Sequence, residues 1–491
     1  TMLSLCLASV GFAAAADNAE IIGYTHVNPQ GAESVKDDRL TDQKPWESQF
    51  DENKGKYDEG KGAKGDRSIA SGIYANALAK DSIAIGSLAN VNNNFGSQVV
   101  QGERSIAIGR EATVNSSKDS IAMGSGAKIL RSDSTLLPSD NSIAIGKLAT
   151  LNQSSNSIAL GHKASVSGNY AKNGAWYGAD NSIAIGNETK VSRENTVAIG
   201  TNVTATRENS VVIGQNASAT RERVVAIGAY ATAGGDRTVA IGSEATASAS
   251  RSIVIGGLGD DKTDGKNFDK ATSADKATQA IVIGNGAQAT DPASYSITLG
   301  NSAKTEAGTG ISIGDRANVA SGATSGIALG KSAVANKSGD IAIGASSSTS
   351  DIHTVSGLNI GDATLSTGVA ATGNGTVSFG NSTIKRQIQN VGAGEISETS
   401  SDVVTGSQLY HVIKAADEIA KTEYKFTAGG SDVRVMGNKG LSATNNASNT
   451  LNFAAADGLD VEGANGTVTY KLNADSKQAI SDAKAAAKTV T

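Results

Sequence analysis

A fixed repeat of about 14 residues dominates the middle of the chain. From Arg193 to Gly256 the sequence repeats a polar turn, a short strand that ends in Ile-Gly, and an Ala-x-Ala segment or a close variant of it. The closing glycines stand at one constant interval, at Gly200, Gly214, Gly228, Gly242 and Gly256. A constant period this short is the signature of an architecture in which each unit stacks on the next.

Each repeat predicts one coil with two short strands. Counted from the closing glycine, β-branched residues stand at positions −3 and −1, as in Val197 and Ile199, which is the period of a strand. Positions +3 and +5 often carry alanine, as in Ala217 and Ala219, and indicate a second strand. Glycine and polar residues supply the two reversals. The sequence therefore predicts an all-β solenoid, a parallel β-roll whose coils bond to each other at about 4.8 Å spacing.

The alternation also suggests which side of each strand is buried. We expect the large residues at −3 and −1 to fill the interior against the small residues at +3 and +5, because large-against-small packing leaves no voids. We expect the alanines between them, such as Ala184, Ala198 and Ala240, to face a neighbouring subunit. Serine at −4, as in Ser82 and Ser142, extends this wall of small residues. A merely neutral exterior is the alternative.

The same pattern extends on both sides of the regular block, with interruptions. Further closing glycines stand at residues 72, 86, 109, 124, 146, 161, 186, 284, 300, 314, 330, 344, 361 and 380. Intervals longer than about 16 residues hold insertions, which must loop out of a stack that stays in register. The main insertions are Asn92–Glu103, Leu130–Asp140, Ser167–Asp180 and Gly257–Lys276.

Composition agrees with a fibre rather than a globular domain. The chain has 491 residues with 57 Gly and only 4% aromatic residues, too few for an ordinary core. A net charge of −5 argues against a nucleic-acid partner. The apolar run from Leu3 to Ala13 resembles the remnant of a secretory signal peptide and contains the only cysteine, Cys6. We therefore expect no disulfides, and no later stretch is long enough for a transmembrane helix.

The pattern changes after residue 384. A polar loop runs from Lys385 to Gln408, and Leu409, Ile413, Ala416 and Ala420 then follow at the spacing of a coiled-coil seam. Residues 424–473 return to alternation of the strand type, and residues 475–490 again show heptad spacing.

These motifs, in this order, resemble those of the trimeric autotransporter adhesins of Gram-negative bacteria. The repeated Asn/Asp-Ser-Ile-Ala-Ile-Gly, as at 141–146 and 181–186, is similar to YadA-like heads, and 385–409 is similar to the neck that follows such heads. The predicted divisions are a signal-peptide remnant (1–16), an N-terminal extension (17–66), a YadA-like β-roll head (67–384), a neck (385–412), a short coiled coil (413–423), a β-rich stalk connector (424–473) and the start of a coiled-coil stalk (474–491).

The resemblance implies more than the repeats themselves do. It implies a left-handed roll, a homotrimer, and a neck that narrows the head onto the stalk, with Arg386, Ile388, Val391 and Leu409 at contacts between subunits. It also implies display on the bacterial cell surface, held in the outer membrane through an anchor absent from this chain.

Catalytic and metal sites find little support in the sequence. His26, His162, His353 and His411 are far apart and have no ligand-type spacing. Acyltransferases with left-handed β-helices are the enzymatic rival, but their repeat has six residues. Asp260, Asp261, Asp264 and Gly265 resemble a calcium loop, yet Ala271 stands where a bidentate Glu belongs. We therefore expect no enzyme, no cofactor and no metal. The stacked Arg-Glu pairs at 193–194, 207–208 and 221–222 are expected to serve solubility and edge protection.

The sequence predicts an adhesin that binds host extracellular matrix, host-cell receptors or other bacterial cells. A structural fibre for self-association and biofilm cohesion is the alternative. Uniform coils distinguish ligands poorly, whereas aromatic residues on insertions are common binding anchors. The candidate ligand-binding residues are Phe95, Tyr170, Trp176 and Tyr177. That they instead pack back onto the roll is the other possibility.

Overall fold

A computed structural model of the chain describes most of the predicted head and parts of the C-terminal region. The described residues are 25–28, 62–63, 65, 67–72, 74–92, 94–95, 98–99, 102–131, 137–168, 170–172, 175–261, 268–353, 358–360, 363–365, 373–421, 423–428, 431–436, 453–465 and 467–490. The expected signal-peptide remnant and nearly all of the N-terminal extension lie outside them.

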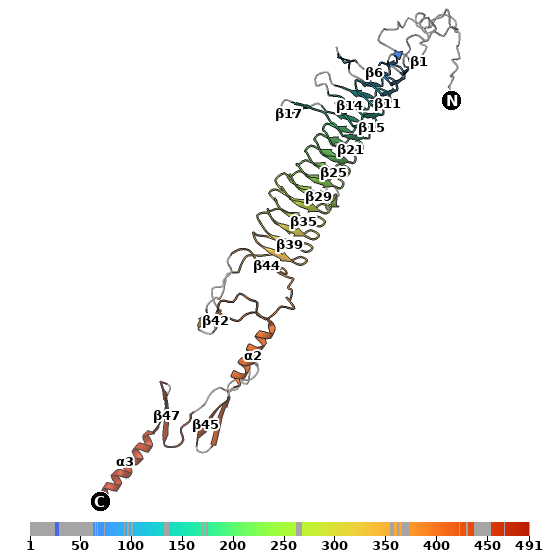
Figure 1. The fold of residues 1–491 in the computed structure, drawn as a ribbon. Helices are drawn as coiled ribbons and strands as arrows, with labels where there is room; N and C mark the ends of the chain where they lie inside the picture. Colours follow the sequence, from blue (N-terminus) through green and yellow to red (C-terminus); the bar gives the residue numbers. More distant parts are fainter. Residues whose placement is uncertain are drawn as a thin grey trace, which may run out of the picture. The chain divides into compact units, whose positions relative to one another are not determined.

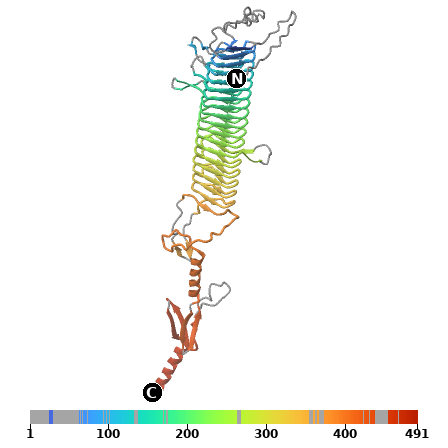
Figure 2. The ribbon, with the colours of Figure 1, turned by 45° about the vertical axis from the view of Figure 1, so that its right-hand side comes forward.

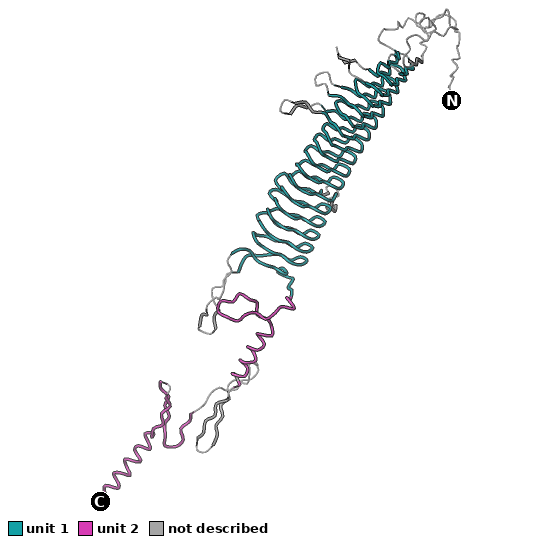
Figure 3. The backbone as a smooth tube through the Cα atoms, viewed as in Figure 1, with its two compact units in different colours: residues 1–354, 371–386 teal, residues 355–370, 387–491 magenta. Residues whose placement is uncertain are grey.

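The chain divides into two compact units, shown in different colours in Figure 3. The first unit, residues 1–354 and 371–386, holds the solenoid, whose coils stack along one axis (Figure 1). The second unit, residues 355–370 and 387–491, holds helices and short hairpins. The predicted parallel β-solenoid is confirmed.

Each coil contributes one strand to each of two long sheets. The first is a 19-stranded sheet in which neighbouring strands pair in parallel, except that β1 (Thr25–Asn28) pairs antiparallel with β3. Its other strands are β3 (Ser68–Ser71), β5 (Ile83–Ile85), β9 (Ile106–Ile108), β11 (Ile121–Met123), β13 (Ile143–Ile145), β15 (Ile158–Leu160), β19 (Ile183–Ile185), β21 (Val197–Ile199), β23 (Val211–Ile213), β25 (Val225–Ile227), β27 (Val239–Ile241), β29 (Ile253–Ile255), β33 (Ile281–Ile283), β35 (Ile297–Leu299), β37 (Ile311–Ile313), β39 (Ile327–Leu329), β41 (Ile341–Ile343) and β44 (Val377–Ser378).

The second sheet is built from the Ala-x-Ala segments and is also parallel. Its strands are β2 (Gly62–Ala63), β4 (Asn76–Ala77), β6 (Asn90–Asn92), β10 (Thr113–Asn115), β12 (Lys128–Leu130), β14 (Thr150–Asn152), β16 (Ser165–Ser167), β20 (Lys190–Val191), β22 (Thr204–Ala205), β24 (Ser218–Ala219), β26 (Thr232–Ala233), β28 (Thr246–Ala247), β32 (Thr272–Ser273), β34 (Gln288–Ala289), β36 (Lys304–Thr305), β38 (Asn318–Val319) and β40 (Val334–Ala335). Pairing in strict sequence order places each repeat position directly over its equivalent in the next coil.

The structure reverses the expected faces of the first sheet. Ala184, Ala198 and Ala240 have no exposed surface and point into the solenoid, whereas Val197 and Ile199 beside Ala198 are only half-buried and point outward. Four interior columns, at −4, −2, +3 and +5, fill the thin space between the sheets, and they carry mostly Ala, Ser, Thr and Val, with Ile129 and Leu151 at +5. Large side chains at both −3 and −1 of every coil would overfill this space. The prediction that the large residues are interior and the alanines face a neighbour is therefore wrong.

Serine at −4 is also interior rather than part of an outer wall. Ser142 is fully buried, and its hydroxyl donates to the Ser154 carbonyl oxygen at 2.8 Å and accepts from the Ser157 amide at 3.3 Å. Both partners belong to the next coil. The serine column thus satisfies backbone groups at the corner of each coil, where the strands have ended and buried polar groups would otherwise cost free energy.

The closing glycine is required by the stacking of the coils. At Gly200 the backbone φ is +142°, and an added Cβ would lie 2.3 Å from the carbonyl oxygen of Gly214 in the next coil. The same close approach recurs at the other closing glycines of the regular block, with φ between +131° and +148°. Neither the conformation nor the space admits a side chain.

One expected coil is absent. Leu358–Ile360 (β42) and Ala363–Leu365 (β43) form an antiparallel hairpin, and β44 pairs directly with β41. The strand expected before residue 361 therefore belongs to a hairpin rather than to a coil, contrary to the prediction, and residue 361 itself lies outside the described residues. The sequence carried a signal, because Asn359 would occupy the interior position −2, where the coils otherwise carry small or β-branched side chains.

The second unit contains two helices and two further hairpins. Helix α2 (Gly406–Ala420) begins at Thr405, whose amide donates to the Gln408 side-chain oxygen at 3.0 Å. The hairpins pair β45 (Glu423–Ala428) with β46 (Ser431–Met436) and β47 (Leu459–Ala464) with β48 (Thr467–Leu472). Helix α3 (Ala474–Thr489) is capped by Asn473. Among the residues described, neither helix is long and apolar enough to cross a membrane.

A buried carboxylate lies at the corner of the coil that ends at Gly344. Asp340 occupies position −4, where most coils carry Ser or Thr, and it is 1% exposed. Its oxygens accept hydrogen bonds from the Thr349 hydroxyl at 2.5 Å and from the Thr376 and Lys337 amides at 2.8 and 2.9 Å. Burial alone would raise the pKa of Asp340, but these donors outweigh it and hold the pKa below its ordinary value.

The glycine stack predicts a large effect of one methyl group. Gly200→Ala should lower the free energy of unfolding by roughly 2–4 kcal/mol, through overpacking and backbone strain. Gly234→Ala is the matched control, because its Cβ would lie 3.7 Å from the nearest atom. Thermal and denaturant unfolding of the two variants would test this, and equal stability of both would contradict the stacking argument.

The depressed pKa of Asp340 predicts a pH dependence. A carboxyl with a lowered folded-state pKa stabilises the fold above its unfolded pKa of about 4, and this contribution is lost as pH falls through the folded value. Asp340→Asn should cost about 1–3 kcal/mol at pH 7, and its deficit relative to the parent should shrink below about pH 4. Asp351→Asn, at an exposed carboxyl, is the control. A deficit that is constant from pH 7 to pH 3 would refute the assignment.

Candidate binding surface

The outer face of the first sheet is a continuous apolar surface. Its two columns at −3 and −1 carry Ile, Val, Leu or Met in every coil from β5 to β41. These side chains are half-buried or exposed; Ile85, Met123 and Leu160 are each 40% exposed. A sheet face that contacts water normally carries charged or polar residues. Apolar patches as long as this one mark surfaces that contact another molecule.

Three insertions leave the solenoid at one corner, the one between the second sheet and the next strand of the first. They follow β6, β12 and β16, which are alternate strands of the second sheet because β10 and β14 lie between them. Two coils separate successive insertions, a distance of about 10 Å. The three points at which the insertions leave the solenoid therefore lie close together along one edge of it.

Two of these insertions form antiparallel hairpins. Asn94–Phe95 (β7) pairs with Gln98–Val99 (β8), and Tyr170–Lys172 (β17) pairs with Ala175–Tyr177 (β18), a pair that projects to one side of the stack in Figure 1. In the second hairpin Tyr170 is opposite Tyr177, and Trp176 is opposite Ala171.

All four candidate ligand-binding residues thus lie on insertion hairpins, with Phe95 on β7 and the other three on the later hairpin. The environment of their side chains lies outside what the structure describes. Their role in binding therefore remains a prediction.

A fourth insertion leaves from the opposite corner. Leu258–Asp261 (β30) and Phe268–Lys270 (β31) pair after the closing Gly256, on the other edge of the solenoid from β17 (Figure 2). The turn between these strands, with Asp264 and Gly265 of the calcium-loop motif, lies outside the described residues. Among the residues described, no group of three or more His, Cys, Asp or Glu could hold a metal ion.

The insertion-bearing corner also carries ladders of polar side chains. At position −5, where φ is positive in every coil from Arg67 to Arg251, Arg67 forms a bidentate ion pair with Asp81 at 2.5 and 2.7 Å. Arg104 pairs with Asp119 in the same way, at 2.6 and 2.9 Å. The guanidinium groups hold the pKa of both carboxyls below the ordinary value.

Asparagine side chains continue this ladder below the ion pairs. The side-chain amides of Asn141, Asn156 and Asn181 each donate to the Oδ1 of the next asparagine at 3.2–3.4 Å, and Asn195 is the last acceptor. Side chains at position −5 therefore link neighbouring coils by ion pairs near the N-terminal end of the solenoid and by amide hydrogen bonds in the coils that follow.

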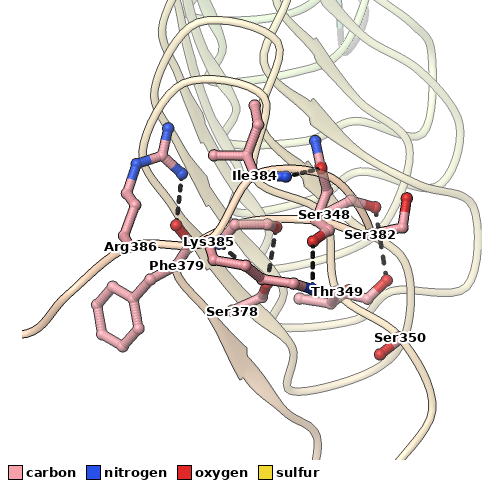
Figure 4. A pocket seen from close by; sticks show the side chains of 11 residues that line it. Ser348, Thr349, Ser350, Ser378, Phe379, Ser382, Ile384, Lys385 and Arg386 are labelled. Atoms are coloured by element: carbon pink, nitrogen blue, oxygen red, sulfur yellow. Dashed lines mark hydrogen bonds between the residues drawn. The ribbon is translucent and has the colours of Figure 1, made fainter.

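The C-terminal end of the solenoid holds a polar hollow of about 560 Å³. Hydroxyl groups of Ser348, Thr349 and Ser378 line it together with residues 379–382 and 384–386 (Figure 4). The Arg386 guanidinium donates to the Ala345 carbonyl oxygen at 2.6 Å, to the Ser347 hydroxyl at 3.0 Å and to the Phe379 carbonyl oxygen. It thereby covers the backbone of the last coil.

The other predicted neck contacts are exposed in the single chain. Ile388, Val391 and Leu409 expose 59%, 45% and 53% of their surface. Their contact with another subunit, and that of Arg386, remains a prediction.

Comparison with known proteins identifies the repeats. The YadA head domain repeat matches residues 63–89, 101–127, 154–171, 178–202, 205–231 and 233–258. The autotransporter adhesin BtaE of Brucella suis biovar 1 (strain 1330) is 33% identical over 140 residues. The matched region covers 28% of this chain and 17% of that protein, so the chain spans a small part of its relative.

Two solved structures share the motif. The collagen-binding domain of the Yersinia adhesin YadA is 20% identical, with 51% of this chain and 97% of that chain covered at a TM-score of 0.19. The C-terminal YadA-like domain of BPSL2063 from Burkholderia pseudomallei is 32% identical, with 20% and 49% covered at a TM-score of 0.17. Superpositions this poor carry no structural argument.

The head repeats and the solenoid lead to one assignment. Both indicate a structural protein rather than an enzyme, and the repeat matches fall on the stacked coils themselves. The resemblance found in the sequence is thus confirmed: the stacked coils of this chain carry the head repeats of YadA-like adhesins.

Proposed function

We propose that this chain is the head of a bacterial surface adhesin that attaches the cell to host matrix or host-cell receptors. The observation that carries the proposal is a regular solenoid with YadA head repeats, three of whose insertions leave from one corner. The stacked coils act as a scaffold, and the insertions project sideways from it. Display on the outside of the cell is part of the same proposal and is supported by the similarity to autotransporter adhesins.

Three copies would assemble through the outer face of the first sheet. Its Ile and Val columns are the only large aliphatic side chains that the coils of the regular block leave half-exposed, within the described residues. Around a threefold axis the columns of three chains would meet and be removed from water at about 25 cal/mol per Å². The expected subunit contact is retained, but with the large residues at the interface in place of the alanines.

If the trimer forms through the outer face of the first sheet, a charged side chain introduced on that face should prevent the trimer from assembling. Ile199→Asp with Ile213→Asp should convert the trimer to a monomer, because carboxylates would be buried without partners. Sedimentation or light scattering would give the mass, and circular dichroism would show whether the solenoid persists.

Thr201→Asp, at an exposed corner of the same coil, is the control and should leave the trimer intact. A double variant that remains trimeric would exclude this face as the interface.

Ligand contact is assigned to the insertions. Coils of the regular block differ little from one another, whereas the hairpin β17–β18 places Tyr170, Trp176 and Tyr177 on two paired strands. Aromatic residues are enriched at binding hot spots, and three copies around an axis would add avidity.

The hairpin can be removed without breaking the stack. Deletion of residues 168–178 leaves Gly161 and Gly186 at the same separation as Gly200 and Gly214, which is the period of the regular coils. The variant should stay trimeric and lose most of its binding to a panel of matrix proteins and receptors, with collagen included. Alanine at Tyr170, Trp176 and Tyr177 should act in the same direction.

Alanine at Tyr230 and Tyr295, which are 53% and 62% exposed on bare coils, is the matched control. Undiminished binding by the deletion variant would move the site elsewhere on the head.

Self-association is the second candidate function. Beads coated with the parent head would aggregate if the fibre mediates cohesion between cells. Aggregation of such beads without binding to any member of the panel would favour cohesion over host attachment.

A further inference from the structure

A cluster of arginines lies on the insertion-bearing corner just below the insertions. In the coils that close at Gly200, Gly214, Gly228, Gly242 and Gly256, positions −7, −6 and −5 form three columns that we call the arginine ledge. Its charged residues are Arg193, Glu194, Arg207, Glu208, Arg221, Glu222, Arg223, Asp236, Arg237 and Arg251. The ledge therefore has six arginines against four carboxylates, in a chain whose net charge is −5.

Backbone hydrogen bonds fix the rows of the ledge. The amide of Arg223 donates to the Glu208 carbonyl oxygen at 3.1 Å, that of Arg237 to Glu222 at 3.0 Å, and that of Arg251 to Asp236 at 2.8 Å. Successive rows are therefore one coil apart, about 4.8 Å. The arginines form a regular array parallel to the solenoid axis.

The guanidinium groups are more accessible than the carboxylates. Arg207, Arg221, Arg223, Arg237 and Arg251 are exposed, whereas the carboxylate column at −6 is half-buried between the two arginine columns. Arg223 pairs with Glu222 at 2.5 Å. No ion pair engages Arg207, Arg221, Arg237 or Arg251 within the described part of the chain. Four cations on one edge thus retain their hydrogen-bond donors for a ligand.

Other coils carry different residues at these positions and still stack in the same way, so the stability of the fold does not explain the arginines. In the coils nearer the N-terminus, arginines alternate with aspartates at position −5. They are followed by asparagines whose side-chain amides hydrogen-bond to one another. At Arg223, Arg237 and Arg251 three like charges follow one another instead. Like charges directly opposite each other on neighbouring strands are destabilising.

We propose that the arginine ledge binds a linear anionic polysaccharide, one that carries sulfate or carboxylate groups, along the solenoid axis. Guanidinium groups bind such oxyanions through paired hydrogen bonds. Repeated cations on a straight edge fit a polymer with repeated anions better than a single small anion. The ledge has no aromatic residue on which bases could stack, which disfavours single-stranded nucleic acid.

The ledge is separate from the two surfaces already assigned. It lies on neither the apolar outer face nor an insertion hairpin, and β17–β18 leaves the same corner one coil above. An edge from which hairpins project has room beside it, so assembly through the first sheet would leave the ledge open. Polysaccharide binding therefore goes beyond attachment through the insertions.

Asparagine substitution tests the proposal without disturbing the corner. Arg223→Asn, Arg237→Asn and Arg251→Asn together extend the amide ladder of the coils above and should leave the melting temperature and assembly state unchanged or improved. Binding of the full chain to immobilised heparin and to dextran sulfate would be measured at several salt concentrations.

The parent should bind at about 0.15 M salt. The triple variant should bind on the order of tenfold more weakly, with a salt dependence reduced by about two units in log–log slope. The matched control removes three cations from other positions, Lys304→Gln, Arg316→Gln and Lys331→Gln, each of which forms an ion pair, and should bind as the parent does.

Four outcomes would overturn the proposal. The parent could fail to bind either polymer at this salt concentration, or the two triple variants could lose binding equally, which would show a net-charge effect. Duplex DNA could also compete as well as dextran sulfate, which would make the polyanion class wrong. A triple variant that melts well below the parent would show that the arginines are structural. None of these results bears on binding by the insertions, which is scored on the matrix and receptor panel.

Discussion

The stacking of one coil directly on the next is the interaction on which the rest of the structure depends. At each closing glycine the chain passes within van der Waals distance of the glycine in the next coil, and its amide donates to the preceding coil, as Gly214 does to Ile199 at 2.9 Å. The parallel sheets on either side then pair without a break. Insertions are tolerated only at the corners, because a residue added within a strand would shift every side chain of that coil to the opposite face.

This stacking turns each repeat position into a column with its own chemistry. Columns at −4, −2, +3 and +5 supply an interior of mostly Ala, Ser, Thr and Val side chains, with serine hydroxyls at its corner. Columns at −3 and −1 form an apolar outer face. The column at −5 changes from ion pairs to amides to arginines along the axis. A column can change its chemistry without altering the backbone, which explains how a uniform solenoid can carry several surfaces.

The thin interior and the apolar outer face follow from the same geometry. Each regular coil has only two strands of two or three residues and two tight corners, so the space between its sheets is thin, and the side chains buried in the regular block are Ala, Val, Ser and Thr. Each coil therefore buries little apolar area by itself. Assembly through the Ile and Val columns would supply the burial that the single chain lacks, as repeat architectures with small cores require.

The sequence by itself determined the repeat, its period, the parallel solenoid and the positions of the insertions, because a fixed spacing of Ile-Gly admits few other folds. It also placed Phe95, Tyr170, Trp176 and Tyr177 on segments outside the coils. It did not determine which face of the first strand is interior. Alternation at period two indicates that a strand has two different faces. The same sequence pattern arises whether the apolar face is buried inside the chain or against another subunit.

Only the tertiary structure decided the faces, since the separation of the two sheets depends on corners that positive φ values and serine hydroxyls close tightly. It alone showed that Leu358–Ile360 and Ala363–Leu365 pair in a hairpin rather than in a coil. It also brought arginines that are one repeat apart in sequence into adjacent rows, because spatial neighbours across a solenoid are set by the stacking of coils.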